Sequence, residues 1–127
     1  MILIIEADHD SADSLRDVLE LHGLEAEVAY TAADGLAKAR KLHPEVVLCD
    51  IGLPGTDGYE IARNLRRDPR TATIRLVALT GCVSDKHRRL AKEAGFDVHV
   101  GKPAETDRLL RLVDRALRGR IGDDSET

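Results

Sequence analysis

The sequence predicts an α/β protein: a doubly wound five-stranded parallel sheet in the order 2-1-3-4-5, with five helices. Short apolar segments alternate along the chain with longer amphipathic segments, which is the pattern of βαβ units. The right-handed crossovers of such units build a parallel sheet that helices cover on both faces. Three of the apolar segments are unbroken and two alternate with polar residues, and this difference predicts the strand order.

The unbroken segments are Ile-Leu-Ile-Ile, Val-Val-Leu-Cys and Leu-Val-Ala-Leu, which are typical of central strands buried on both faces. The second and fifth strands alternate, with Glu27 in one and Asp97 and His99 in the other, as half-exposed edge strands do. The expected strands cover residues 1–6, 26–30, 45–50, 74–80 and 96–100.

The expected helices cover residues 11–22, 32–42, 58–67, 85–94 and 104–118. In the first, Leu15, Val18, Leu19 and His22 share one face, and Gly23 ends the helix. The fourth has few apolar anchors, which makes it a candidate for a mobile element.

The last expected helix carries an apolar stripe and, opposite to it, a basic stripe. The basic stripe is either a solvated face interleaved with acidic residues or a docking or dimer surface. It consists of Arg108, Arg111, Arg115 and Arg118.

Length and composition restrict the class of protein. A chain of 127 residues with 33% charged residues is long enough for one globular domain, expected over residues 1–119 and followed by a flexible acidic tail over 120–127. No apolar run approaches the roughly 18 residues of a membrane helix, and no signal peptide is expected. The net charge of -4 argues against direct nucleic-acid binding. Cys49 and Cys82 lack metal or disulfide spacing, so a cytoplasmic location is expected.

Chemically active side chains collect where the expected strands end. Glu6 ends the first strand, Asp50 the third and Thr80 the fourth, while Lys102 follows the fifth. In this topology the carboxyl ends of strands one and three form the ligand site. Neighbouring carboxylates need a cation, and hard oxygen ligands favour Mg²⁺. Asp50 could then act as a nucleophile toward a phosphoryl group, with Lys102 neutralising charge and Thr80 donating a hydrogen bond.

Three segments carry a resemblance to a known family. They are residues 49–60, the tripeptide Leu79-Thr80-Gly81, and residues 94–103, which end in Lys102-Pro103. Together they resemble the receiver domain of response regulators in two-component signalling, and the second half is especially similar to receivers of hybrid sensor kinases. The resemblance implies a flavodoxin-like receiver fold and a signalling domain rather than an enzyme.

The resemblance also implies roles for particular residues. Asp50 would take a phosphoryl group from the phosphohistidine of a histidine kinase or phosphotransfer protein, and a downstream protein would read the result. Thr80 would be the switch hydroxyl and Lys102 its charge partner. The backbone carbonyl of Gly52 would bind Mg²⁺, together with Glu6 and Asp50. His99 stands where the family often has a rotating aromatic residue, so an imidazole would report the switch.

One position departs from the family pattern, which has two adjacent acidic residues after the first strand. Here the pair reads Glu6-Ala7, so Ala7 removes a metal ligand and a negative charge. Loss of a residue that hydrogen-bonds to a metal ligand typically reduces metal affinity roughly 10–100-fold. Loss of a ligand itself should reduce the affinity by at least as much. Asp8 could substitute as a ligand. The alternative is a degenerate receiver that binds proteins without phosphorylation.

Other interpretations compete for the same residues. Glu6 or Asp8 could cap the following helix, Asp10 is a candidate N-cap, and His99 could be a polar residue of an edge strand. A phosphatase with an aspartyl-phosphate intermediate would need an acid at the position of Gly52. A flavin carrier would need a hydroxyl- and glycine-rich loop after the first strand, where this chain has carboxylates.

Overall fold

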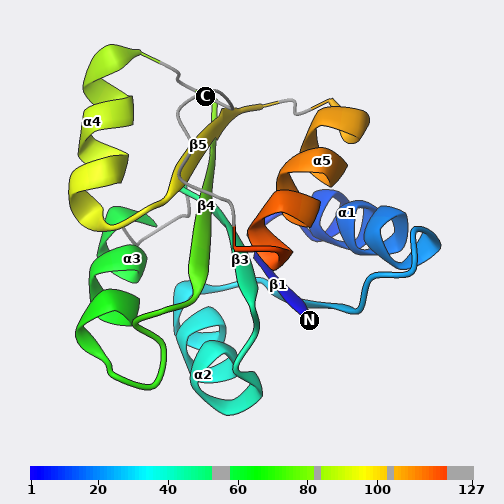
Figure 1. Cartoon of the computed structure of the whole chain (residues 1–127), viewed down its shortest axis with the longest axis horizontal. Helices are drawn as coiled ribbons and strands as arrows, with labels where there is room; N and C mark the ends of the chain where they lie inside the picture. The colour runs from blue at the N-terminus through cyan, green and yellow to red at the C-terminus, as the bar shows by residue number, and fades with distance from the viewer. Residues whose placement is uncertain (53–57, 82–83, 103–104, 120–127) are drawn as a thin grey trace.

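The computed structural model describes residues 1–52, 58–81, 84–102 and 105–119. Within them lies one parallel sheet in the order β2-β1-β3-β4-β5, which confirms the expected fold class and strand order (Figure 1). The strands are β1 (Ile2–Ile5), β2 (Ala26–Ala29), β3 (Val46–Asp50), β4 (Arg75–Thr80) and β5 (Val98–Gly101). The helices are α1 (His9–Leu21), α2 (Ala32–Leu42), α3 (Gly58–Arg67), α4 (Asp85–Ala94) and α5 (Thr106–Leu117). The proposed tail, residues 120–127, lies outside the described residues.

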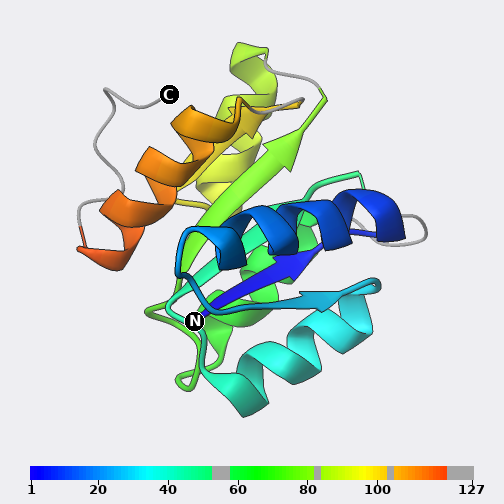
Figure 2. The same ribbon diagram turned by 90° about the vertical axis from the view of Figure 1, so that its right-hand side faces the viewer.

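Helices cover both faces of the sheet, as the alternation of strands and helices predicts. Helices α1 and α5 lie on one face and α2, α3 and α4 on the other (Figures 1 and 2). Successive residues of a strand point to opposite faces. Ile2 and Ile4 of β1 therefore pack with α1 and α5, whereas Leu3 and Ile5 pack with α2 and α3. Both faces of the central strands are apolar because each face is buried under a layer of helices.

Local signals fix the helix ends. The Thr31 hydroxyl accepts a hydrogen bond from the backbone N–H of Asp34 at 3.1 Å, and Ser84 caps α4 through the N–H of His87 at 3.2 Å. Helix α4 ends at Ala94 and is capped by Gly95, whose φ of +117° is a conformation that side-chain-bearing residues rarely adopt. Of the described helices, none is long and apolar enough to cross a membrane.

Helix α1 differs from expectation at both ends. It begins at His9, so Asp10 lies in its first turn rather than at the N-cap, which is Asp8. His22 is exposed and contributes nothing to the apolar face, because it follows the last residue of the helix. Its Nδ1 lies 2.9 Å from the carbonyl oxygen of Val18.

Strand β5 is not half-exposed, although it is an edge strand. His99 is only 5% exposed, since alternation turns it toward the face that α4 covers, while Val98 and Val100 face α5. The expectation of an exposed polar position at His99 is therefore wrong. The sequence does not show how closely α4 packs over the edge of the sheet.

Candidate functional site

Three buried polar side chains lie at the carboxyl ends of the central strands. Glu6 directly follows β1 and is 6% exposed, Asp50 ends β3 and is 9% exposed, and Thr80 ends β4 and is 6% exposed. Buried polar groups need partners, and a buried charge needs an opposite charge. Such a concentration at one sheet edge is typical of a functional site rather than of a structural core.

Lys102 supplies that opposite charge. Its Nζ lies 2.7 Å from Oε1 of Glu6 and 3.4 Å from Oδ2 of Asp50. The backbone places it there, because the N–H of Lys102 donates to the carbonyl oxygen of Thr80 at 2.7 Å. The structure thus brings together four residues that are far apart in the sequence.

The remaining oxygens of the two carboxylates have backbone partners. The N–H of Gly52 donates to Oδ1 of Asp50 at 3.0 Å, and the N–H of Asp8 donates to Oε2 of Glu6 at 3.2 Å. These bonds fix both carboxylates without using the oxygen of Asp50 nearest Lys102. That oxygen, Oδ2, is the one best placed to act as a nucleophile beside a positive charge.

The electrostatics of the site favour a charged lysine and a neutral thiol. Burial alone would lower the pKa of Lys102, but the hydrogen bond to Glu6 and the charge of Asp50 outweigh it and raise that pKa. Burial, followed by the charges of Asp50 and Glu6, raises the pKa of the Cys49 thiol far above its usual range. Cys49 therefore packs as a small apolar residue beside the site.

The carboxylate of Asp8 does not join this arrangement. Asp8 is exposed, and its Oδ2 accepts a hydrogen bond from the hydroxyl of Ser11, which lies in the first turn of α1. Within the described ranges no three acidic, histidine or cysteine side chains are grouped so that they could hold a metal ion. Gly52, whose carbonyl is the predicted metal ligand, is exposed and lies two residues after Asp50, to which its backbone N–H donates.

His99 lies apart from the carboxylates, two residues before the Gly101 that pairs with Thr80. Its ring is buried, and neither nitrogen has a hydrogen-bond partner among the residues that the structure describes. Burial, and then the nearby Arg88 and His87 side chains, lower the pKa of His99. The imidazole is therefore neutral near pH 7.

One structural contact at the opposite end of the sheet from the site is made by a residue that carries no signal in the sequence. Arg66 on α3 donates to the carbonyl oxygens of Ala72, Ile74 and Gly95 and forms an ion pair with Asp97 at 2.9 Å. Asp97 in turn accepts from the N–H of Leu76 at 2.8 Å. Arg66 thereby joins α3 to the starts of β4 and β5. It resembles any other arginine of a helix, so only its contacts reveal this role.

A doubly wound parallel sheet with two carboxylates, a hydroxyl and a lysine at its carboxyl edge defines the chain as a doubly wound α/β domain with a polar site at that edge, and comparison with known proteins identifies the family. The model of the response regulator receiver domain matches residues 2–114. The chain therefore belongs to the receiver-domain family of two-component signalling.

Relatives in the family differ in architecture. Protein PilH of Pseudomonas aeruginosa is 31% identical, with 93% of this chain and 98% of that protein covered. The DNA-binding regulator RpaA of Synechocystis is 34% identical over 92% of this chain but only 48% of its own length. The chain thus spans about half of such DNA-binding relatives.

Solved structures give the same assignment of family. A CheY-like receiver domain of Methanospirillum hungatei superposes with a TM-score of 0.86 at 29% identity, covering 99% of this chain and 97% of that one. The receiver domain of a histidine kinase from Syntrophus aciditrophicus gives 0.84 at 28% identity, covering 93% and 89%. Receivers of several architectures match about equally well, so these comparisons do not favour the receivers of hybrid sensor kinases over other receivers.

Proposed function

We propose that this chain is the phosphoacceptor domain of a two-component phosphorelay and that Asp50 is the phosphorylated residue. The observation that carries the proposal is the buried carboxylate of Asp50, with Oδ2 lying 3.4 Å from Nζ of Lys102. The donor would be a phosphohistidine of a histidine kinase or phosphotransfer protein. Because such kinases draw on ATP, the proposed place of action is the cytoplasm. The domain would serve as a signalling module and not as an enzyme.

The proposed transfer uses the chain's own groups in distinct roles. An oxygen of Asp50 attacks phosphorus, the P–N bond of the donor breaks, and its electron pair returns to the donor imidazole. Lys102 offsets charge on the incoming phosphoryl group, and the hydroxyl of Thr80 donates a hydrogen bond to one of its oxygens. The backbone N–H of Gly52 holds Asp50 in position through Oδ1.

The donor set suits Mg²⁺ in chemistry but is short of one ligand. Glu6, Asp50 and the carbonyl of Gly52 offer hard oxygens, and Mg²⁺ commonly keeps several waters beside one or two carboxylates. When bound, the ion would neutralise charge on the phosphoryl oxygens. Lys102 already contacts Glu6, and Ala7 offers no carboxylate, so these residues would hold the ion weakly.

Phosphorylation would alter the surface that a downstream protein contacts. A phosphoryl group adds about two negative charges beside Lys102 and Thr80. The backbone N–H of Lys102 is hydrogen-bonded to the carbonyl oxygen of Thr80, and β5 directly precedes Lys102. Movement at Thr80 would therefore reach β5, His99 and the neighbouring α4.

The experiment is phosphorylation of the full chain with acetyl phosphate and Mg²⁺, followed by intact-mass measurement. We expect a gain of one phosphoryl mass on the wild type and none on Asp50→Asn. The matched control is Asp17→Asn, an exposed carboxylate on α1, which should behave as the wild type. No gain on the wild type, or an equal gain on Asp50→Asn, would refute the proposal.

A second candidate function is a degenerate receiver that binds its partner without phosphorylation. It is favoured by one observation, the absence of a three-carboxylate group among the described residues, which follows from Ala7 and from the contact between Asp8 and Ser11. In that case the mass would not change, and binding of the partner would be the same with and without phosphodonor.

A further inference from the structure

A pocket of about 460 Å³ lies between the sheet and helices α1 and α5, beside the carboxylates of the candidate site. Glu6, Ser11 and Lys102 contribute polar groups to it at the carboxyl edge of the sheet. The rest of the lining, which we call the apolar lining of the α1–α5 pocket, consists of Ile4, Leu15, Leu79 and Leu109. Pockets of this size that combine an apolar lining with a few polar groups are typical binding sites for small molecules.

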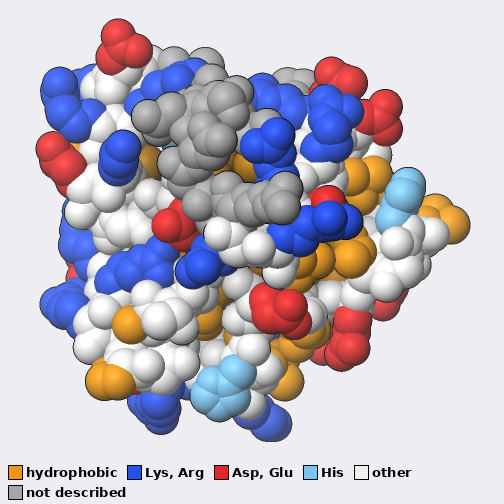
Figure 3. Space-filling model, viewed as in Figure 1, with side chains coloured by type: hydrophobic (Ala, Val, Ile, Leu, Met, Phe, Trp, Pro, Cys, Tyr) orange, Lys and Arg blue, Asp and Glu red, His pale blue; other side chains and the backbone are white. Residues whose placement is uncertain are grey.

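The α1–α5 pocket is open to solvent. Ser11 and Lys102 are exposed, and Leu15 is only partly buried. Figure 3 shows hydrophobic side chains at the surface over α1 and α5, in the right half of that view, whereas lysine and arginine side chains gather over α3 and α4 at its left. A solute can therefore reach the apolar lining without unfolding of either helix.

The charges beside the pocket do not balance. Glu6 and Asp50 are buried, and among the described residues Lys102 is the only cation that forms an ion pair with either of them. Its Nζ lies 2.7 Å from Glu6 but 3.4 Å from Oδ2 of Asp50, so this oxygen has no short contact with a cation. Two buried carboxylates with one ammonium leave one negative charge, and a buried charge needs an opposite charge. The α1–α5 pocket therefore favours a cationic ligand over an anionic one.

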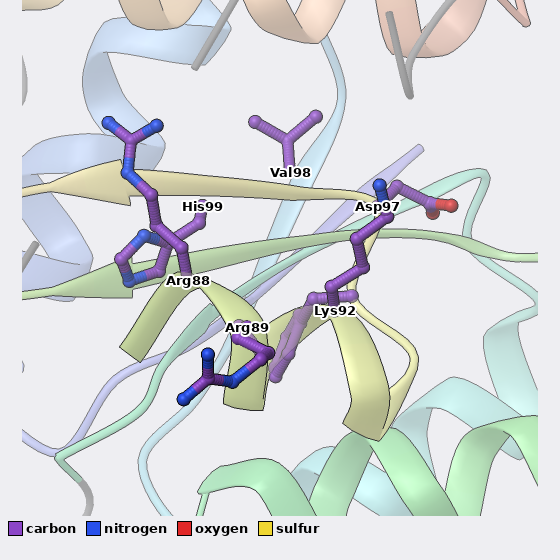
Figure 4. Close-up of a pocket in the computed structure, with 8 residues that line it drawn as sticks. Arg88, Arg89, Lys92, Asp97, Val98 and His99 are labelled. Atoms are coloured by element: carbon purple, nitrogen blue, oxygen red, sulfur yellow. The ribbon is translucent and has the colours of Figure 1, made fainter. Parts of the chain in front are cut away.

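A second pocket has the opposite charge. It measures about 300 Å³ and lies between α4 and β5, where Arg88, Arg89 and Lys92 surround it (Figure 4). Asp97 also lines this second pocket, but its carboxylate is paired with Arg66. A cationic ligand should consequently distinguish the two pockets by their charge.

We propose that the α1–α5 pocket binds a small aliphatic amine in its protonated form. The ammonium group lies beside Glu6 and Asp50 and supplies the missing positive charge, while the alkyl chain covers the apolar lining. An aliphatic alcohol covers the lining but leaves the charge unbalanced, and an aliphatic carboxylate adds repulsion. The inference goes beyond the proposed function, because binding of the amine requires no phosphodonor.

The test is a series of amine titrations into the ¹⁵N,¹³C-labelled full chain at neutral pH, without phosphodonor. From ethylamine through butylamine to hexylamine, we expect the affinity to rise roughly fourfold per added methylene. The largest methyl shifts should fall on Ile4, Leu15 and Leu79. Hexanol should bind at least about tenfold more weakly than hexylamine, and hexanoate more weakly still. Equal affinity for hexanol and hexylamine, or shifts centred on Ala91 and Val98 in the second pocket, would overturn the proposal.

Variants separate the contributions of the alkyl chain and the ammonium group. Leu15→Phe fills the pocket and should weaken hexylamine at least about tenfold. Its matched control is Leu36→Phe, at a partly buried leucine on the opposite face of the sheet. Glu6→Gln removes the surplus negative charge and should weaken hexylamine roughly tenfold while leaving hexanol unchanged.

The Glu6→Gln variant decides the question if Leu15→Phe does not fold. Unchanged hexylamine affinity in Glu6→Gln would contradict the proposal, as would equal losses in Leu15→Phe and Leu36→Phe.

These outcomes are separable from the proposed function. Binding of hexylamine to a chain that acetyl phosphate does not modify would support the pocket and count against phosphorylation of Asp50. Phosphorylation of Asp50 in a chain that binds none of the amines would do the reverse.

Discussion

The ammonium of Lys102 lies closer to Glu6, at 2.7 Å, than to Asp50, at 3.4 Å. Two buried carboxylates thus share one cation, and Glu6 holds it more tightly. The contact leaves Oδ2 of Asp50 beside a positive charge without a short bond to it, an arrangement that suits a nucleophile. It also means that a metal ion at Glu6 must compete with an ammonium already in place.

Lys102→Met should abolish most phosphorylation. Loss of the ammonium leaves Glu6 and Asp50 unopposed and removes charge stabilisation from the transferred group, which is typically worth roughly 10²–10³-fold in rate. The measurement is the initial rate of phosphate incorporation from acetyl phosphate. Lys41→Met, an exposed lysine at the end of α2, is the control. A rate within about twofold of wild type would show that Lys102 has no part in the transfer.

Ala7→Asp should raise the affinity for Mg²⁺ at least roughly 10–100-fold, because a residue that only hydrogen-bonds to a metal ligand already contributes that much. It should also lower stability in the absence of Mg²⁺, because a third carboxylate joins two that share one lysine. The chain has no tryptophan, so amide shifts or calorimetry would report binding. Asp8→Asn serves as the control, since the carboxylate of Asp8 contacts Ser11 and should not affect affinity. Unchanged affinity in Ala7→Asp would place the metal elsewhere.

His99→Phe should reduce the pH dependence of stability. Burial lowers the pKa of His99 below its usual 6.5 in the folded chain, so the unfolded chain binds a proton there first as the pH falls. The contribution of His99 is complete above about pH 6.5 and is lost as the pH falls toward the lower, folded pKa. Urea titrations at several pH values measure the free energy of unfolding, with exposed His22→Gln as the control. Parallel curves for wild type and His99→Phe would be inconsistent with a buried neutral imidazole.

Arg66→Met should lower the free energy of unfolding by about 2 kcal/mol, since it removes the guanidinium that pairs with Asp97 and donates to three carbonyl oxygens. Arg63→Met is the matched control on the same helix, because its ion pair with Glu60 is exposed and should contribute under about 1 kcal/mol. Urea denaturation followed by circular dichroism compares the two. Equal losses would show that the Arg66 contacts carry no special weight.

The fold follows from the sequence because unbroken and alternating apolar runs distinguish central from edge strands. Residues at strand ends, such as Asp50 and Thr80, come together through topology alone, which the order of the strands already determines. The burial of His99 and the contact of Asp8 with Ser11 could not be anticipated. The first depends on how α4 packs over β5, and the second on a side-chain rotamer at the start of α1. The contacts of Arg66 likewise depend on where α3 ends relative to three loops.

The most direct test of the account is to locate the phosphoryl group itself. Reduction of the acyl phosphate with borohydride converts the modified aspartate to homoserine, which tandem mass spectrometry identifies by position. After treatment with acetyl phosphate and Mg²⁺, we expect homoserine at position 50 and at no other aspartate. Modification of Asp8 or Asp10 in place of Asp50, or no modification at all, would contradict the account.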